Sequence, residues 1–238
     1  SRSPEWIQKK LLSIGLRPIN SLVDITNFIT IDIGRPLHVF DADKIGSILH
    51  MRNANDGEKI YALDKKEYQL DSSITVIADK KNPLAIAGII GGSETGCTDN
   101  TKNVFLEVAL FDPSKVAKTG RKLGINSDAR YRFERGLDKE MIEEGLEYAS
   151  YLINKICGGS VSKNTSAGKL DKKTHVIDYN FNYFEKVIGL SLSSEFQTKI
   201  LKSLLFKINK ITEKSCSVEV PSWRNDVIQP IDLVEEII

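Results

Sequence analysis

The spacing of apolar residues predicts a first region in which helices flank a sheet. After Ser3, the expected N-cap, apolar residues recur at helical intervals until Gly15, which predicts a first helix. Residues 22–33 fit both a strand and a helical stripe, and we favour a helix. Helices are expected again from Pro113 and over residues 137–157. Between the early and late helices, short apolar runs separated by turn residues predict strands over 48–52, 59–63, 74–78, 84–90 and 104–110.

A polar stretch over residues 162–173 separates this region from one with a different pattern. We place a domain boundary there, which gives domains over residues 1–168 and 172–238. The second region predicts two short helices and then two strands, over residues 181–188, 194–205, 206–211 and 217–220. That order is typical of a winged-helix module. The expected fold class is therefore α+β: a mixed sheet core with flanking helices, followed by a small winged-helix-like α+β domain.

The last residues of the chain, 233–238, have the pattern of an amphipathic helix that lacks a C-cap. We therefore expect the winged-helix-like domain to be truncated and the chain to be part of a longer polypeptide.

Composition indicates an ordinary globular protein and disfavours several classes. The 238 residues are 41% hydrophobic and 27% charged, and no apolar run approaches the ~20 residues of a membrane helix. The N-terminus lacks the apolar core of a signal peptide, so we expect a soluble, cytoplasmic protein. Three scattered cysteines predict neither a disulfide framework nor a zinc cluster. The net charge of +1 argues against a stand-alone electrostatic nucleic-acid binder.

Glu107 is a lone carboxylate within the apolar run 105–110. A buried carboxylate is costly unless something pairs with it, so Glu107 either faces a polar pocket or lies on the wet face of its sheet. From this segment alone the exposed position is the better interpretation. A basic segment follows, with Lys115, Lys118, Arg121, Lys122, Arg130, Arg132 and Arg135.

Other candidate groups do not assemble into a known catalytic motif. The glycines at 88, 91, 92 and 96 do not have dinucleotide-binding spacing, and they favour turns with close backbone approach. Thr26, Asn27 and His38 bring a hydroxyl, an amide and an imidazole from neighbouring segments. Neither a Ser-His-Asp order nor a metal-binding histidine pair is present, so nucleophilic and zinc chemistry are disfavoured.

An acidic group near the C-terminus allows two interpretations. It consists of Asp226, Asp232, Glu235 and Glu236. Their spacing favours a helix start, with Asp232 as N-cap and Glu235 as its capping-box partner. The alternative is a Mg²⁺ site, because that ion takes a few carboxylates and several waters.

Several long motifs together resemble the β subunit of bacterial phenylalanyl-tRNA synthetase. They span nearly the whole chain and include Arg17-Pro18-Ile19-Asn20, Val23-Asp24-Ile25-Thr26-Asn27, Arg35-Pro36-Leu37-His38-Val39-Phe40-Asp41, Ala85-Ile86-Ala87-Gly88-Ile89-Ile90-Gly91-Gly92, Leu106-Glu107-Val108-Ala109-Leu110-Phe111-Asp112-Pro113, Arg132-Phe133-Glu134-Arg135-Gly136 and Pro221-Ser222-Trp223-Arg224-Asn225-Asp226. The resemblance implies that the first domain is a tRNA-editing domain. Its pocket would then contain Thr26, Asn27, His38, Ala87, Gly88 and Glu107.

The resemblance also implies roles for these residues. Glu107 would accept the hydroxyl of a mischarged tyrosine, while His38, Thr26 and Asn27 orient the ester and water, and Ala87 and Gly88 line the pocket. Water would attack the ester directly, and a tRNA ribose hydroxyl is a candidate to assist. A site that hydrogen-bonds a substrate hydroxyl discriminates strongly against the analogue without it.

For the complete enzyme, the resemblance implies partners and cofactors outside this chain. These are an α subunit that carries aminoacylation, an α2β2 tetramer, tRNA specific for phenylalanine, ATP that does not bind this fragment, and Mg²⁺ on the acidic group, shared with the α subunit. A non-catalytic RNA-binding or assembly module stays open as the alternative. A free-standing dinucleotide-binding enzyme is a distant third.

Overall fold

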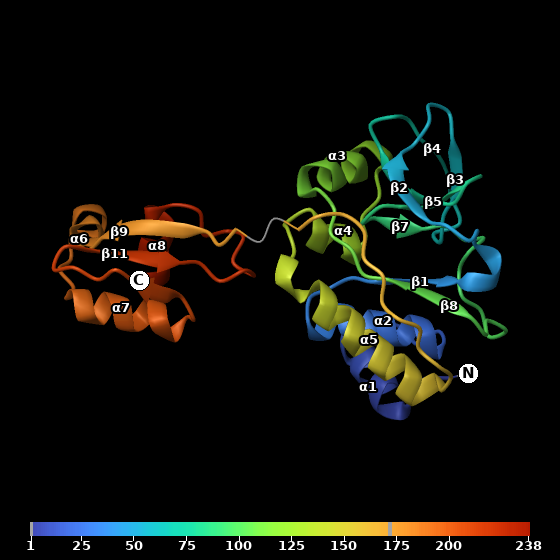
Figure 1. Cartoon of the computed structure of the whole chain (residues 1–238), viewed down its shortest axis with the longest axis horizontal. Helices are drawn as coiled ribbons and strands as arrows, with labels where there is room; N and C mark the ends of the chain where they lie inside the picture. The colour runs from blue at the N-terminus through green and yellow to red at the C-terminus, as the bar shows by residue number, and fades with distance from the viewer. Residues whose placement is uncertain (1, 171–172) are drawn as a thin grey trace. The chain divides into compact units, whose positions relative to one another are not determined.

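The chain divides into two compact units. The computed structural model describes residues 2–170 and 173–238, and the contact pattern assigns 1–137 and 141–166 to the first unit and 138–140 and 167–238 to the second. Each unit combines helices with antiparallel strands, so the predicted α+β class is confirmed (Figure 1). The assignment of these parts to an editing domain and a winged-helix-like domain stays a prediction.

Three helices of the first unit pack together on one buried cluster. These are α1 (Glu5–Ser13), α2 (Ser21–Asp32) and α5 (Ile142–Cys157). The ambiguous segment after residue 22 is helical because Asn20 caps it, accepting a hydrogen bond from the Val23 amide at 3.0 Å. The predicted Ser3 cap is wrong: Pro4 is the N-cap of α1, and the Ser3 hydroxyl donates to the buried Asp24 carboxylate instead.

The strands of the first unit form three antiparallel sheets. Strands β1 (His38–Asp41) and β8 (Val104–Glu107) pair with each other, as do β3 (Lys59–Tyr61) and β4 (Glu67–Gln69). A four-stranded sheet has the order β2-β5-β6-β7, with bounds His50–Asn53, Thr75–Ala78, Pro83–Ile86 and Ile90–Gly91.

The strand pattern differs from the expectation at several places. The apolar pattern missed β1 and β4, and the single strand expected over 84–90 is two strands, β6 and β7. Gly88 lies between them with φ of +69°, a left-handed conformation that glycine adopts without steric cost. The run expected to extend to residue 110 ends as a strand at Glu107.

Two helices follow β8. The first, α3 (Pro113–Leu123), begins as expected at Pro113 and is capped by Asp112, whose side chain accepts from the Lys115 amide. The second, α4 (Asp128–Phe133), was not expected, because six residues show too little periodicity to be recognised. Two short 3₁₀ helices span Ala42–Lys44 and Lys139–Met141.

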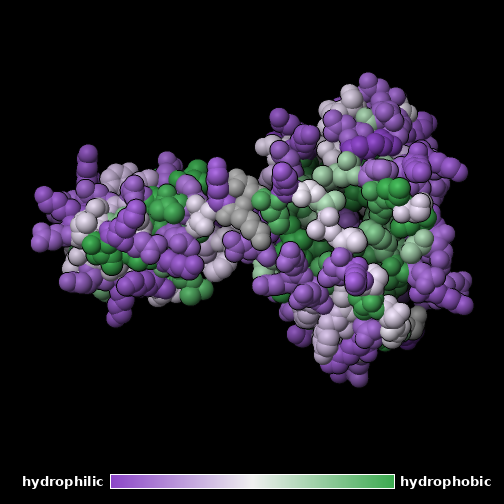
Figure 2. Space-filling model, in the orientation of Figure 1, coloured by the Kyte–Doolittle hydropathy of each residue, from purple (hydrophilic) through white to green (hydrophobic). Residues whose placement is uncertain are grey.

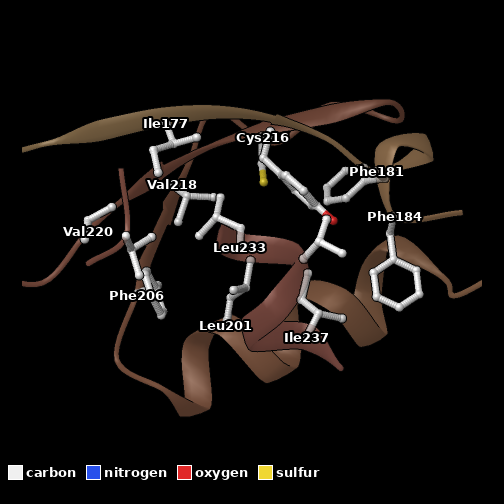
Figure 3. Packing of buried hydrophobic residues seen from close by; sticks show 13 residues of the cluster. Ile177, Phe181, Phe184, Leu201, Phe206, Cys216, Val218, Val220, Leu233 and Ile237 are labelled. Carbon is white, nitrogen blue, oxygen red and sulfur yellow. The ribbon is translucent and has the colours of Figure 1, made fainter. Parts of the chain in front are cut away.

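The second unit has a three-stranded sheet packed on helices. Its elements are β9 (Val176–Asn180), α6 (Asn182–Ile188), α7 (Ser194–Ser203), β10 (Lys207–Asn209), β11 (Ser215–Glu219) and α8 (Pro230–Ile237). The sheet order is β10-β11-β9, so the expected two-stranded hairpin has β9 as a third strand. Figure 3 shows side chains of the sheet and the helices meeting in one core, with Leu201 and Leu233 at its centre.

Helix α8 begins earlier than the acidic pattern suggested. Gln229 is the N-cap, and Asp232 is its partner three residues on, accepting from the Ile228 and Gln229 amides at 2.8 and 2.9 Å. The predicted cap at Asp232 with Glu235 as partner is therefore wrong by one turn. The cause is that Pro230 occupies the first helical position and moves the start of the helix upstream.

Candidate functional site

His38 and Glu107 lie directly opposite each other on the β1–β8 ladder. Opposite residues project from the same face of a sheet with Cβ atoms about 4.5–5.5 Å apart. Phe40 and Phe105 form the next rung on this face, and the His38 ring packs edge-on against Phe40 at 4.3 Å between centroids. On the opposite face Leu106 packs against the helical cluster of α1, α2 and α5. The fold therefore brings the predicted imidazole and carboxylate together on one rung.

Burial shifts the pKa of both Glu107 and His38. Desolvation raises the pKa of Glu107 to about 7 and lowers the pKa of His38 to about 4. The buried Nε2 of His38 has no hydrogen-bond partner among the described residues. At neutral pH the imidazole is therefore uncharged, and the carboxyl group is near its midpoint. Perturbed titratable groups of this kind cluster at functional sites.

The turn between β6 and β7 packs against this pair. A Cβ atom on Gly91 would lie 2.4 Å from Cε1 and 2.8 Å from Nε2 of His38, so the imidazole lies against the glycine backbone. At the other end of the turn, a Cβ on Gly88 would meet Phe111, Phe133 and Val116. The sequence pattern suggested close backbone approach at these glycines but did not identify His38 as the group that approaches Gly91.

Helix α4 is attached to the same turn. The Ser127 hydroxyl caps α4 by accepting from the Arg130 amide and donates to the Ile89 carbonyl at 2.7 Å. Phe133 packs against Phe111 at 4.9 Å between ring centroids. The turn therefore has His38 on one side and α4 on the other. Its β7 strand lies beside β1 under a surface where apolar residues gather, whereas polar residues cover β2, β3 and β4 (Figure 2).

Arg35 is a further residue near the pair that sequence reasoning did not select. Its side chain is 2% exposed and donates from Nη1 to the carbonyl of Ala109 at 3.3 Å. It packs on Gly145 of α5, where a Cβ atom would lie 2.8 Å from Cδ of Arg35. Arg35 therefore joins the segment before His38 to the segment after Glu107. The long sequence separation of these contacts left no local signal.

Thr26 and Asn27 lie on α2, which contacts β1. The buried Thr26 hydroxyl donates to the Val23 carbonyl at 2.9 Å, within the helix. The half-buried Asn27 amide makes no hydrogen bond to the described residues. Their roles at the reacting end of a substrate stay a prediction.

Ala87 lines a separate cavity of about 220 Å³. The cavity is bounded by β2, β5 and the start of α3, including Thr75, Phe111 and Lys115, and its lining does not include His38 or Glu107. Of the six residues predicted for one pocket, Ala87 and Gly88 therefore lie at one end of the β6–β7 turn, and His38 packs against Gly91 at its other end.

The predicted metal ligands of the second unit are engaged with other groups. Arg224 forms paired hydrogen bonds with Asp226 and with Glu236, and Asp232 caps α8. Glu235 is exposed. Among the described residues no three histidine, cysteine or acidic side chains are grouped to hold a metal ion. These carboxylates do not fit a Mg²⁺ site within this chain, and their assignment as ligands stays a prediction for the complete enzyme.

Comparison with known proteins identifies the family. The "B3/4 domain" family matches residues 1–158, and the "tRNA synthetase B5 domain" family matches residues 177–238. The chain belongs to the B3/4 domain family. In this B3/4–B5 chain, the pair His38 and Glu107 and the β6–β7 turn all lie within the B3/4 match. The acidic group lies within the B5 match.

The relatives with high identity to this chain are longer proteins. The chain is 49% identical over 235 residues to phenylalanine–tRNA ligase β subunits of Brucella suis and Brucella melitensis, and 49% identical over 236 residues to that of Nitrobacter winogradskyi. These matches cover 99% of the chain but 29% of each relative, so the chain spans less than a third of their length. The resemblance to phenylalanyl-tRNA synthetase β subunits is thereby confirmed.

A solved structure with weaker similarity is an N-terminal fragment of the phenylalanyl-tRNA synthetase β subunit from Pyrococcus horikoshii. It is 19% identical, with a TM-score of 0.43, over 91% of this chain and 64% of that one. Among the described residues, no helix is long and apolar enough to cross a membrane.

Proposed function

We propose that this chain is the editing part of a phenylalanyl-tRNA synthetase β subunit and hydrolyses the ester of mischarged Tyr-tRNA. Membership in the B3/4 family and 49% identity to β subunits support the assignment to that enzyme. The observation that carries the editing role is the half-buried, cross-strand pair of Glu107 and His38, in which the imidazole is uncharged and the carboxyl group is near its midpoint at neutral pH.

In this proposal Glu107 selects the amino acid. A tyrosine hydroxyl donates a hydrogen bond to the Glu107 carboxylate, whereas phenylalanine would leave the buried group without a partner. Leaving a buried polar group unsatisfied costs about 1–3 kcal/mol, and more for a charged one. Because burial already raises the pKa of Glu107 to about 7, a hydroxyl donor that favours the ionised form offsets part of the desolvation cost.

His38 acts at the ester. Its neutral imidazole orients the ester and the attacking water, which loses one proton as it attacks. The water oxygen then bonds to the ester carbon, the bond to the ribose oxygen breaks, and the proton goes to the leaving ribose hydroxyl. Thr26 and Asn27 orient the ester, and the Ala87–Gly88 backbone lines the pocket.

The complete enzyme supplies the remaining parts. We propose that it pairs this β subunit with an α subunit in an α2β2 tetramer, binds tRNA specific for phenylalanine, and uses ATP at a site outside this chain. Mg²⁺ would bind at the acidic group only with ligands from the other subunit, because Asp226, Asp232 and Glu236 are occupied here. The relatives' names support a ligase that works with tRNA, and we propose that the enzyme acts in the cytoplasm.

The test is deacylation by the complete enzyme carrying Glu107→Ala. We expect the removal of tyrosine to slow by about one to two decades, because the variant loses a hydrogen bond to a charged group worth about 1.5–3 kcal/mol. The preference for Tyr-tRNA over Phe-tRNA should fall by a similar factor. Rates on both preformed aminoacyl-tRNAs measure the two effects, and the rate of phenylalanine attachment verifies that the variant is folded.

His38→Ala is the matched comparison on the same rung. It should slow hydrolysis of both esters and leave the preference between them almost unchanged. A variant that keeps its rate but loses selectivity would show that the roles of the two residues are exchanged. Wild-type deacylation by both variants would favour the alternative, a non-catalytic RNA-binding or assembly module.

A further inference from the structure

Helix α4 presents an exposed aromatic ring with a guanidinium stacked on it. Tyr131 is 56% exposed, and Cζ of Arg135 lies 3.7 Å from the centre of its ring. The Arg135 side chain is 54% exposed, donates from Nη1 to the Tyr131 carbonyl at 2.7 Å, and contacts Glu134. These contacts hold the guanidinium over the ring, and the phenol hydroxyl makes no hydrogen bond to the described residues.

Two contacts attach α4, the helix that carries Tyr131, to the turn beside the candidate site. The hydroxyl of Ser127, at the start of the helix, donates a hydrogen bond to the Ile89 carbonyl in the β6–β7 turn. The Phe133 ring packs against Gly88 so closely that a Cβ atom added there would lie 3.2 Å from it. Gly91 at the other end of the same turn contacts His38. The turn therefore links α4 to β1, the strand that carries His38.

The neighbouring helix supplies positive charge. Helix α3 contacts α4 and carries Lys115, Lys118, Arg121 and Lys122 without an acidic residue over its eleven positions. Lys122 pairs with Asp71, whereas Lys115, Lys118 and Arg121 are exposed. In a chain whose net charge is only +1, this is a local concentration of cations. Exposed cations beside a stacking surface are the combination that binds single-stranded nucleic acid.

We propose that Tyr131 and Arg135 form a stacking platform for the terminal bases of the tRNA substrate. The inference rests on the proposed function, because the ester to be hydrolysed is carried by the single-stranded acceptor end of a tRNA. Bases of such ends stack on aromatic rings and on guanidinium planes, and both surfaces are present here. The platform holds the strand so that its terminal ester reaches His38, and α3 neutralises the adjacent phosphates.

The first experiment is single-turnover deacylation of Tyr-tRNA by the complete enzyme, with the enzyme concentration varied. Tyr131→Leu keeps an apolar contact for the Arg135 stem but removes the ring. We expect the enzyme concentration for half-maximal rate to rise about 5- to 150-fold, the range reported for loss of one base–aromatic stack. The maximal rate should change by less than about twofold, because the ring does not touch the reacting atoms. Tyr131→Phe should behave as wild type.

The chain offers a matched control on another helix. Tyr151 of α5 is also 56% exposed and also has a cation four residues on, with Nζ of Lys155 at 5.3 Å from its ring. Tyr151→Leu should leave both kinetic parameters unchanged. An equal rise for Tyr131→Leu and Tyr151→Leu, or no rise for Tyr131→Leu, would overturn the proposal. A fall in maximal rate without a change in half-saturation would also overturn it, since that pattern indicates a purely structural role.

The second experiment measures directly whether the terminal base of the tRNA stacks on the platform. A tRNA with 2-aminopurine at its 3′ end should lose fluorescence on binding, and Tyr131→Leu or Arg135→Gln should reduce that loss, while Tyr151→Leu should not. Quenching that is independent of Tyr131 would contradict the proposal. If the wild-type enzyme quenches the probe through Tyr131 but fails to hydrolyse Tyr-tRNA, the editing function is wrong and the platform stands. The two failures are therefore distinguishable.

Discussion

At the scale of single residues, His38 and Glu107 control protonation at the candidate site. Both shifts arise from burial, and they have opposite signs: an acid becomes harder to ionise and an imidazole harder to protonate. Between about pH 4 and pH 7 both side chains are therefore mainly uncharged in the folded protein. A neutral rung avoids burying an ion pair and leaves both groups available to a polar substrate.

The two shifts predict opposite effects on the free energy of unfolding. Glu107 reduces stability as the pH rises from its ordinary pKa of 4.5 towards 7, because the unfolded state releases its proton first. His38 reduces stability as the pH falls from 6.5 towards 4, because the unfolded state takes up a proton first. In the wild type these two contributions to the pH dependence of stability have opposite signs.

Glu107→Gln should remove the pH dependence of the free energy of unfolding that is due to Glu107. Relative to wild type, we expect its free energy of unfolding to increase by about 1–3 kcal/mol between pH 4.5 and pH 7. His38→Gln should show the opposite trend, with stability gained towards low pH. Urea unfolding of the 238-residue chain at several pH values measures both. Parallel curves for wild type and Glu107→Gln would show that the pKa of Glu107 is not raised.

At the scale of elements, the ends of helices are decided by individual polar contacts. Asn20 fixes the start of α2, Ser127 that of α4, and the reciprocal bonds of Gln229 and Asp232 that of α8. In each case a side chain satisfies an amide that the helix leaves without a partner. The carboxylates of α8 that resemble metal ligands in sequence are thus partly explained by helix structure.

Asp232→Ala should lower the free energy of unfolding by about 1 kcal/mol, because two amides at the start of α8 lose their acceptor. Glu235→Ala on the same helix is the control, since the Glu235 side chain is exposed and forms no hydrogen bond or ion pair with the described residues. Denaturant unfolding of the chain without added metal compares the two. Equal stability of both variants would indicate that Asp232 has no capping role.

At the scale of the whole molecule, the two units have separate cores. One buried cluster, which includes Leu201, Leu233 and Phe206, belongs to the second unit, and the clusters around Leu152, Ile74 and Phe40 belong to the first. Because stability depends on contacts within each cluster, a cavity in one core should be felt mainly in its own unit.

Leu233→Ala removes a fully buried side chain from the second core and should cost about 2–5 kcal/mol. We expect faster amide hydrogen exchange over residues 174–238, with little change over residues 5–157. Leu152→Ala is the reciprocal variant and should affect the first range. Mass-spectrometric hydrogen exchange on the intact chain tests both. Equal loss of protection in both ranges after either substitution would show that the chain unfolds as a single unit.

The sequence by itself determined the elements that have strong local signals. Apolar periodicity, with Gly15 and Pro113 as end signals, was sufficient to predict α1, α3 and α5, whereas it left the segment of α2 open between helix and strand. Short apolar runs bounded by turns predicted most strands. Local patterns failed where an element was short, as for α4 and β4, or where a tertiary partner decided the conformation, as for Ser3, whose hydroxyl bonds to Asp24 instead of capping α1. The long motifs predicted the family, which the comparisons confirm.

Only the tertiary structure decided how the candidate residues meet. Nothing local indicates that His38 pairs with Glu107, which lies 69 positions away, or that the ring of His38 rests on Gly91. The pKa shifts also depend on this packing, because desolvation is a property of the assembled core. Likewise, the charges of Asp226 and Glu236 suggested a metal, and the fold instead places Arg224 between them. Sequence specifies which groups are present, but long-range contacts specify which of them remain free to act.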